Sequence, residues 1–181
     1  MMQRGLDPEK LVFLDETGAK SNMTRLYGRA LKGKRLVDKA PHGHWVNTTY
    51  VCALRKSGMT APAVFAGAMN KARFEDYVRD VLCPTLHEGD VVVWDNLPAH
   101  KNAKVKELIE ETSAKLLPIP PYSPDLNPIE MSFSKLKSLL RKEKIRDVGK
   151  LHEFLLTSRK FFSNTECKNY FKHPGYDYTN Y

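Results

Sequence analysis

Short apolar runs alternate with helical patterns along the chain, and together they predict a layered domain of strands and helices. Residues 44–55 and 61–67 are rich in β-branched and aromatic side chains and flank a Ser57-Gly58 turn signal, which predicts a β-hairpin. Continuous apolar runs that are closed by polar residues predict buried strands. These runs are LVFLDET (11–17), DVVVWDN (90–96) and AKLLPIP (114–120).

Helices are predicted between these strands. Apolar residues recur at helical spacing over residues 70–86, where Asn70 is a candidate N-cap. Further helices are predicted over 99–112, 128–143 and 148–162. The resulting order of β, β-hairpin, α, β, α, β, α indicates an α/β fold with a mixed sheet flanked by helices on its faces.

The remaining segments predict little regular structure. Residues 17–40 contain glycines and many basic residues without a clear period, so they are interpreted as a loop or insertion. The aromatic, turn-rich end FKHPGYDYTNY is interpreted as a tail that packs on its own domain, although an interface is the alternative. A chain of 181 residues suits one domain over 1–181, with a core over about 10–145 and a C-terminal helix and tail over 146–181.

Charge adds a hint about partners. The chain has a net charge of +8, concentrated in two segments. Residues 17–40 carry seven Lys or Arg against one acid, and residues 131–160 carry nine against three. Such basic clusters suit contacts with a phosphate backbone, but an ordinary solvated surface explains the charge alone equally well.

Other composition features narrow the setting. Cys52, Cys83 and Cys167 are widely spaced and form no CxxC pair, which argues against a disulfide framework or a zinc–thiolate site. The apolar runs are far shorter than the roughly 20 residues that span a bilayer, and the N-terminus has no apolar signal core. We therefore expect a cytoplasmic protein without a membrane partner, and a loop or strand edge rather than a metal site at His42–His44.

Three acidic residues occupy positions where such a sheet presents side chains. Asp15 lies at the end of the first strand, Asp95 closes the strand VVVW, and Glu130 opens a helix after the proline-rich loop PPYSPDLNPIE. Ligands gather outside the carboxyl ends of strands in α/β sheets, so these carboxylates are candidates for one site. Converging carboxylates repel one another unless a cation lies between them, and two hard divalent cations can support phosphoryl displacement.

Each of these acids also has a simple structural interpretation. Asp15 and Asp95 could be turn residues that end strands. Glu130 could complete a capping box in which Asn127 is the N-cap and Pro128 the first helical residue. Glu16 is predicted to point to the opposite strand face from Asp15 and is not expected to be a ligand.

Three motifs give the chain a resemblance. FLDETG, VVVWDNLPAHK and LPIPPYSPDLNPIE, in this order, resemble the catalytic core of mariner-type DDE transposases, and most of all the bacterial insertion-sequence (IS six-thirty) branch. Asp95 and Glu130 are separated by 34 residues, which is the spacing typical of that branch. The resemblance covers roughly residues 10 to 145 and extends more loosely to the end of the chain.

The resemblance implies a ribonuclease-H-like fold, in agreement with the predicted order of elements. It also implies a catalytic site in which Asp15, Asp95 and Glu130 bind two Mg²⁺, with Mn²⁺ as a substitute. In this family such a site hydrolyses phosphodiesters at transposon ends and joins the freed 3′-hydroxyl to a target, usually TA. The proline-rich loop would then stiffen the approach to the helix that carries the third ligand.

The same resemblance suggests which residues surround the site. Asn96 and His100 match the family pattern and are candidates for positions beside the metal ligands, although His100 as a helix cap is the favoured interpretation. Basic residues in the two charged segments and after Asp95 are candidate phosphate contacts. They are Lys32, Lys34, Arg35, Lys101, Lys104, Lys135, Lys137 and Arg141.

Full-length relatives begin with helix-turn-helix modules that recognise the transposon ends, whereas here the first catalytic strand begins near residue 11. We therefore expect a catalytic module that needs a separate N-terminal DNA-binding half and works as a dimer on double-stranded DNA, associated with a bacterial nucleoid. Two alternatives stay open: a ribonuclease-H-fold nuclease without strand transfer, and a truncated remnant that binds DNA without cutting it.

Overall fold

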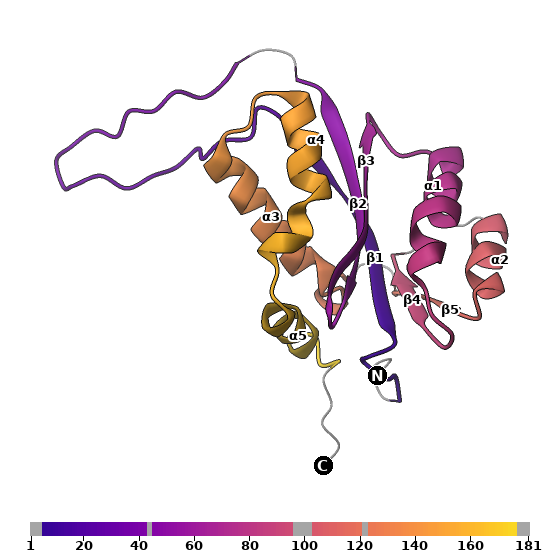
Figure 1. Ribbon diagram of the computed structural model, residues 1–181. Coiled ribbons are helices and arrows are strands. Elements are labelled where there is room, and N and C mark those ends of the chain that lie inside the picture. Colours follow the sequence, from indigo (N-terminus) through magenta and orange to yellow (C-terminus); the bar gives the residue numbers. More distant parts are fainter. Residues whose placement is uncertain (1–4, 43–44, 96–102, 121–122, 177–181) are drawn as a thin grey trace.

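The computed structural model describes residues 5–42, 45–95, 103–120 and 123–176 (Figure 1). Its centre is one five-stranded sheet in the order β3-β2-β1-β4-β5. The β1–β2 and β2–β3 pairs are antiparallel, and the β1–β4 and β4–β5 pairs are parallel. The strands are β1 (Leu11–Lys20), β2 (Asn47–Arg55), β3 (Gly58–Ala66), β4 (Val91–Trp94) and β5 (Lys115–Pro118).

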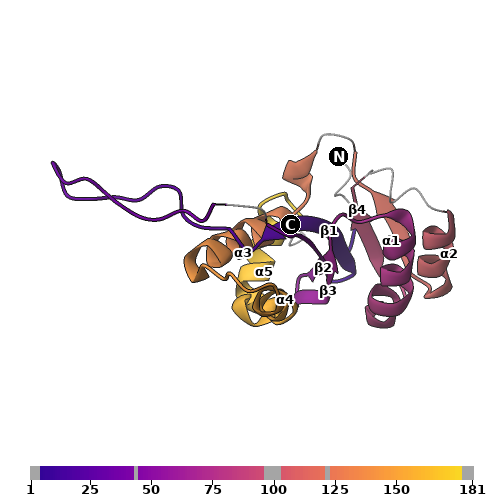
Figure 2. The same cartoon turned by 90° about the horizontal axis from the view of Figure 1, so that it is seen from above.

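Helices cover both faces of this sheet, as Figures 1 and 2 show. One layer consists of α1 (Lys71–Tyr77) and α2 (Ala103–Glu111). The other consists of α3 (Ile129–Glu143), α4 (Val148–Leu156) and α5 (Asn164–Lys172). The predicted α/β class, with a mixed sheet flanked by helices, is confirmed.

Alternation along β1 creates two cores. Leu11 and Phe13 pack with the buried side chains of α3, α4 and α5, whereas Val12 and Leu14 pack with those of α1 and α2. Successive side chains of a strand point to opposite faces, so a strand that is apolar at every position is buried on both sides. β1 is therefore the central element of the domain.

Several element boundaries differ from the sequence predictions. β1 continues to Lys20 instead of ending at residue 17, because Glu16 to Lys20 pair with the start of β2. The predicted 70–86 helix is α1 followed by a π-helical turn (Val78–Leu82) and a 3₁₀ turn (Cys83–Thr85). Its predicted cap is confirmed, since Asn70 Oδ1 accepts a hydrogen bond from the Arg73 backbone N–H at 3.0 Å.

The C-terminal region contains more helix than predicted. The single helix predicted over 148–162 is α4 followed by a 3₁₀ turn (Ser158–Phe161), and Thr157 at the break donates its hydroxyl to the Glu153 carbonyl at 2.8 Å. α5 was not predicted, because only Cys167 and Phe171 of its nine residues are buried. Beyond it, the rings of Tyr176 and Phe13 lie 4.9 Å apart, so this part of the tail packs on its own domain as predicted.

Between β1 and β2, residues 21–42 form an arm that leaves the domain (Figures 1 and 2). Most of its described residues are exposed, including the large apolar side chains of Leu26, Tyr27 and Leu31. No helix in the described ranges is long and apolar enough to cross a membrane.

A buried ion pair joins the tip of the β2–β3 hairpin to the start of β4. Arg55 Nη2 donates to Asp90 Oδ2 at 2.6 Å and to the Thr85 carbonyl at 2.8 Å, and the His87 backbone N–H also donates to Asp90 Oδ2. Burial raises the pKa of Asp90, but the hydrogen bonds from Arg55 and His87 outweigh it and hold this pKa below its ordinary value. The ionised form of Asp90 therefore stabilises the fold.

We predict that Asp90→Asn lowers the free energy of unfolding by about 3 kcal/mol at pH 7, because it leaves Arg55 without its charged partner. The pKa of Asp90 is lowered in the folded state, so its contribution is present above the ordinary carboxylate pKa and is lost as pH falls through the folded value. Urea unfolding between pH 7 and 2.5 should show the gap between the two proteins closing below about pH 4.

The matched control is Asp76→Asn, which removes an exposed ion pair with Arg79 and should cost under about 0.5 kcal/mol. A gap between Asp90→Asn and the unmutated protein that stays constant down to pH 2.5 would contradict the assignment.

Candidate active site

The parallel pairing of β1 with β4 brings two of the predicted carboxylates to neighbouring strands. The ladder ends at the Leu14–Trp94 pair, and the next residues along the two strands are Asp15 and Asp95. Two carboxylates that follow the same rung of a parallel ladder leave the sheet at the same level, since the strands run in one direction.

Strand alternation also determines the face on which these side chains lie. Asp15 lies two residues after Phe13, which packs under α3, so both side chains lie on the same face of the strand. Asp95 lies two residues after Val93, which belongs to the same core as Phe13. Asp15 is thus directed toward the α3 layer, where it contacts Asn127, and alternation continued past Trp94 would direct Asp95 to the same side. Glu16 lies two residues after Leu14, which packs on the α1–α2 side. Its side chain therefore lies on the opposite face from Asp15, in agreement with the prediction.

Asp15 is buried and fixed by hydrogen bonds. Its exposed fraction is 7%, its Oδ1 accepts from the Glu16 backbone N–H at 2.7 Å, and its Oδ2 accepts from Asn127 Nδ2 at 2.9 Å. The donor Asn127 lies 112 residues further along the chain, in the loop before α3. This contact joins the centre of the sheet directly to the segment that carries Glu130.

The alternative interpretation, in which the Asn127 side chain caps α3, does not agree with the structure. The N-cap of α3 is Pro128, which makes no side-chain cap hydrogen bond, and Asn127 contributes only its backbone carbonyl, which accepts from the Glu130 N–H at 3.2 Å. The amide instead donates to Asp15, a buried carboxylate whose oxygens require hydrogen-bond donors.

Glu130 lies in the first turn of α3, where its side chain is exposed. The helix is anchored beside it by Ile129 and Phe133, which are buried in the core. A 3₁₀ turn (Pro124–Leu126) precedes it, and the Leu126 carbonyl accepts from the Tyr176 hydroxyl at 3.0 Å. Proline-fixed backbone and these contacts restrain the approach to Glu130, as the sequence predicted.

Asp15, in the middle of β1, and Asp95 thus follow the same rung of the β1–β4 ladder, and Glu130 lies three residues after Asn127, which contacts Asp15. Within the described ranges no three acidic, histidine or cysteine side chains lie close enough together to hold a metal ion. The available donors are nevertheless carboxylate and amide oxygens, which are the ligands that hard divalent cations bind. Asn127 Oδ1 is also buried beside Asp15 and accepts no hydrogen bond within the described residues. These residues fit a magnesium or manganese ion.

Some predicted site residues lie outside the described residues. They are Asn96, His100 and Lys101.

The residues predicted to contact phosphate differ in their exposure and in the contacts that they already make within the protein. Lys32, Lys34 and Arg35 are exposed on the arm. The arm is joined to the end of α3 by an ion pair between Asp38 and Lys144, at 3.0 Å. Its cations thus project beyond α3 on the side of the molecule opposite to α1 and α2 (Figure 1).

Among the predicted contacts on α3, Lys137 is half-buried and Arg141 is exposed. Lys135 donates to both carboxylate oxygens of Glu166 at 2.8 and 2.6 Å, and to the Phe161 carbonyl at 2.6 Å. All three donors of its ammonium are engaged between α3 and α5, which suits a structural role better than a phosphate contact.

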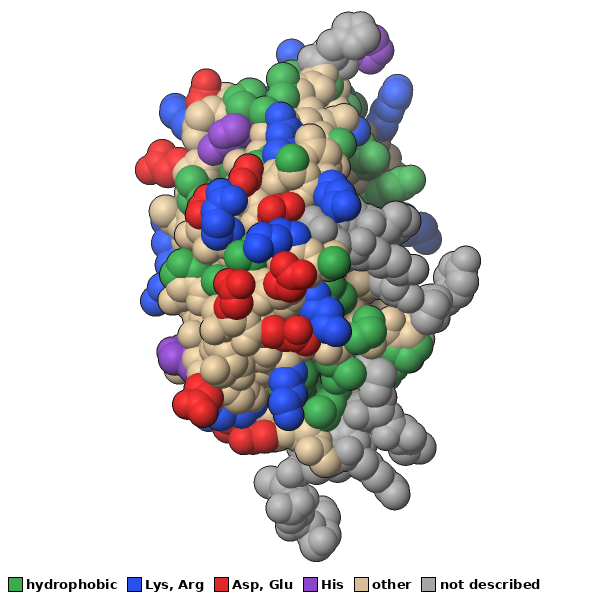
Figure 3. All heavy atoms as spheres, turned by 90° about the vertical axis from the view of Figure 1, so that its right-hand side faces the viewer, with side chains coloured by type: hydrophobic (Ala, Val, Ile, Leu, Met, Phe, Trp, Pro, Cys, Tyr) green, Lys and Arg blue, Asp and Glu red, His purple; other side chains and the backbone are tan. Residues whose placement is uncertain are grey.

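Lys104 on α2 lies 3.6 Å from Glu107. The face that carries α1 and α2 shows acidic and basic side chains interspersed (Figure 3), without one dominant sign of charge. A surface of this kind offers less attraction to a polyanion than the arm does.

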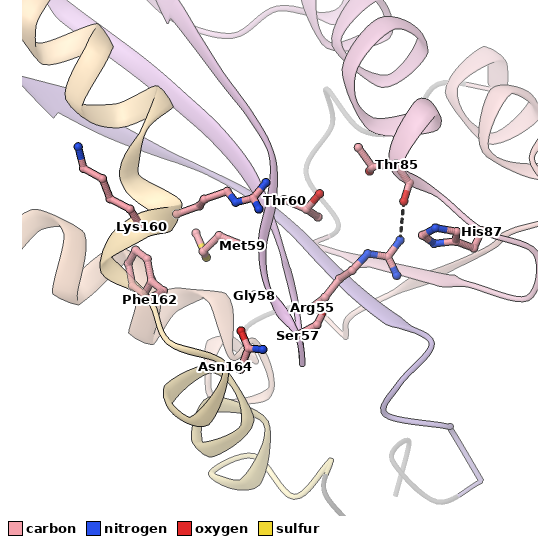
Figure 4. A pocket seen from close by; sticks show the side chains of 11 residues that line it. Arg55, Ser57, Gly58, Met59, Thr60, Thr85, His87, Lys160, Phe162 and Asn164 are labelled. Atoms are coloured by element: carbon pink, nitrogen blue, oxygen red, sulfur yellow. Dashed lines mark hydrogen bonds between the residues drawn. The ribbon is translucent and has the colours of Figure 1, made fainter.

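A pocket that was not predicted from the sequence lies at the tip of the β2–β3 hairpin. It has a volume of about 560 Å³, and its charged lining residues are Arg55, His87, Arg159 and Lys160. Figure 4 shows Arg55 directed toward Thr85 and His87, with Lys160 on the other side of the hairpin. The Arg55–Asp90 ion pair explains this arrangement as structural.

Residues 10–152 match the sequence profile of the DDE superfamily endonucleases. The chain belongs to this family. It shows no match to any curated protein.

Solved structures of Mos1 transposase share the fold. The Mos1 mariner paired-end complex with Mn superposes with a TM-score of 0.78 at 19% sequence identity, over 96% of this chain and 55% of that chain. The pre-cleavage Mos1 transpososome gives 0.75 at 18%, over 92% and 53%. The catalytic domain of Mos1 mariner transposase gives 0.68 at 17%, over 92% and 78%.

These findings confirm the predicted ribonuclease-H-like fold and the resemblance to DDE transposases. The chain spans about half the length of the Mos1 chains in the paired-end complex and in the transpososome. The predicted insertion-sequence branch stays a prediction.

We predict that Lys135→Gln lowers the free energy of unfolding by about 2 kcal/mol, because it removes charge-assisted hydrogen bonds that join α3 to α5. Its affinity for duplex DNA should stay within about twofold of the unmutated protein. Lys137→Gln, two residues along the same helix, is the control and should be near neutral in urea unfolding. A stable Lys135→Gln protein with strongly reduced DNA affinity would instead make Lys135 a phosphate contact.

Proposed function

We propose that this chain is the catalytic domain of a DNA transposase, a metal-dependent endonuclease and strand-transferase of the insertion-sequence branch. The observation that carries the proposal is that Asp15 and Asp95 follow the same rung of the parallel β1–β4 ladder, and that Asp15 contacts the loop before α3, whose first turn contains Glu130, in a chain of the DDE family. The 34-residue spacing between Asp95 and Glu130 supports the choice of branch.

Asp15, Asp95 and Glu130 would hold two Mg²⁺, with Mn²⁺ as a substitute. Structures of the Mos1 catalytic domain with Mg and with Mn support this choice of ion. At such a site, two divalent ions would supply polarisation of the scissile phosphate and activation of the attacking oxygen for in-line displacement. The attacking oxygen would be water during cleavage and a DNA 3′-hydroxyl during joining.

The chain itself supplies position and charge. The sheet and α3 fix the three carboxylates on separate rigid elements, so that they need little rearrangement when a substrate binds. Exposed cations of the arm and of α3, such as Lys34, Arg35 and Arg141, would bind the DNA backbone on the same side of the sheet.

The partners of this domain would be double-stranded DNA, namely transposon ends and a TA target, and a second copy of the chain on that DNA. A separate N-terminal DNA-binding half would supply recognition of the ends. The Mos1 assemblies on transposon ends support a DNA partner. The setting that fits these partners is the bacterial cytoplasm, at the nucleoid.

The test is plasmid nicking with Mg²⁺ or Mn²⁺. Asp95→Asn replaces one carboxylate by an amide of the same shape and should reduce metal-dependent nicking by about 10³-fold or more, since it removes several kcal/mol of charge stabilisation. Asp76→Asn on α1, outside the site, should nick as well as the unmutated protein.

Equal nicking by Asp95→Asn and the unmutated protein would overturn the proposed site. If neither the unmutated protein nor Asp95→Asn nicks the plasmid, the assay is repeated with the N-terminal half added. Absence of nicking in that assay as well would identify a non-catalytic DNA-binding remnant. Joining of pre-cleaved ends to a target plasmid separates a transposase from a ribonuclease-H-fold nuclease that only hydrolyses.

We further predict that the arm contributes phosphate contacts. Lys34→Gln/Arg35→Gln should reduce the slope of log K against log salt by about 2 for a short duplex, because each lost phosphate contact releases about one counterion fewer. The matched double variant is Arg79→Gln/Lys106→Gln on the face of mixed charge, which should leave the slope unchanged. Equal slopes for both double variants would place the DNA elsewhere.

A further inference from the structure

The loop before α3 contributes more to the site than stiffness. We propose that Asn127 is a positioning residue that fixes the Asp15 carboxylate in the orientation that binds the divalent cation. The inference rests on the proposed function, because it assigns a role within the same site. It adds a fourth residue to the three carboxylates and couples two of them physically.

The first argument is the geometry of Asp15. Its two oxygens accept from different directions, Oδ1 from the Glu16 backbone N–H at 2.7 Å and Oδ2 from Asn127 Nδ2 at 2.9 Å. A carboxylate oxygen carries two lone pairs, so each of these bonds leaves a further acceptor direction on the same oxygen. Donors on both oxygens hold the plane of the carboxylate, which a single bond would leave free to rotate.

The second argument is charge. An ionised carboxylate only accepts hydrogen bonds, so the contact at 2.9 Å requires the amide nitrogen of Asn127 to face Asp15. A neutral amide stabilises the carboxylate without neutralising it and leaves its full charge for a cation. A lysine or arginine at this position would compete with that cation.

The third argument is the rigidity of Asn127 itself. The residue is 6% exposed, and its backbone N–H donates to the Pro124 carbonyl at 3.0 Å. Its own carbonyl accepts from the Glu130 N–H at 3.2 Å. Asn127 is therefore held in the same turn as Glu130 while its side chain holds Asp15, so one residue sets the position of the first acid relative to the third.

The fourth argument is the environment of the amide oxygen of Asn127. Asn127 Oδ1 is buried and accepts no hydrogen bond within the described residues. Buried acceptors without a donor are uncommon in folded proteins. A donor that arrives with a ligand satisfies such an atom, and hydrated Mg²⁺ carries water molecules that donate.

The test is direct titration of the full chain with Mn²⁺, followed by the electron paramagnetic resonance signal of the free ion. Asn127→Ala should weaken Mn²⁺ binding by 10- to 100-fold, which is the usual effect of removing a group that orients a metal ligand. Asn127→Ser, whose side chain is too short to reach Asp15, should weaken it similarly and covers the case in which the alanine variant does not fold.

The matched control is Ser132→Ala on α3, which removes another buried oxygen that has no hydrogen-bond partner in the described part of the chain. It should bind Mn²⁺ like the unmutated protein, so a loss confined to Asn127 excludes a general effect of disturbing the helix. Duplex DNA affinity measured without divalent cations should be unchanged in all three variants.

Mn²⁺ affinity that is equal in a folded Asn127 variant, in Ser132→Ala and in the unmutated protein would overturn the inference and leave the proposed function intact. An unmutated protein that binds no Mn²⁺ would overturn the proposed metal site, and the inference with it.

Discussion

The parallel pairing of β1 with β4 is the interaction on which the rest of this structure depends. It makes β1 an interior strand with both faces covered, and it sets the rung after which Asp15 and Asp95 emerge. A shift of one residue in this register would turn every side chain of one strand to the other face. Asp95 would then lie over the α1–α2 core, away from Asp15 and α3.

Burial secures that register. Leu11, Val12, Phe13 and Leu14 are all at most 1% exposed, and they alternate between two cores built by different helices. The side chains that fill one core do not fit the other, because packed interiors tolerate little change of shape. The carboxylates are thus positioned by apolar contacts that make no direct contribution to the chemistry.

Much of this arrangement could be predicted from the sequence because it depends on local patterns. The runs LVFL and VVVW predict buried strands, and an acid at the end of each predicts a shared site once the strands are parallel neighbours. The role of Asn127 could not be predicted, because the local pattern around Glu130 offers only a capping box as an alternative, whereas the partner of its side chain, Asp15, is 112 residues away. Periodicity also gave no signal for α5, since two buried side chains in nine residues make a weak stripe.

The strand order also decides when during synthesis the site can form. β1 emerges first, but its parallel partner β4 begins 80 residues later, and Asn127 reaches Asp15 only after a further stretch of chain. Contacts between such distant segments form late, because the loop between them must be closed first. A ribosome that stops before residue 127 therefore releases a fragment without the Asn127 contact and without Glu130. The topology therefore delays assembly of the candidate site until Asn127 and Glu130 have been synthesised.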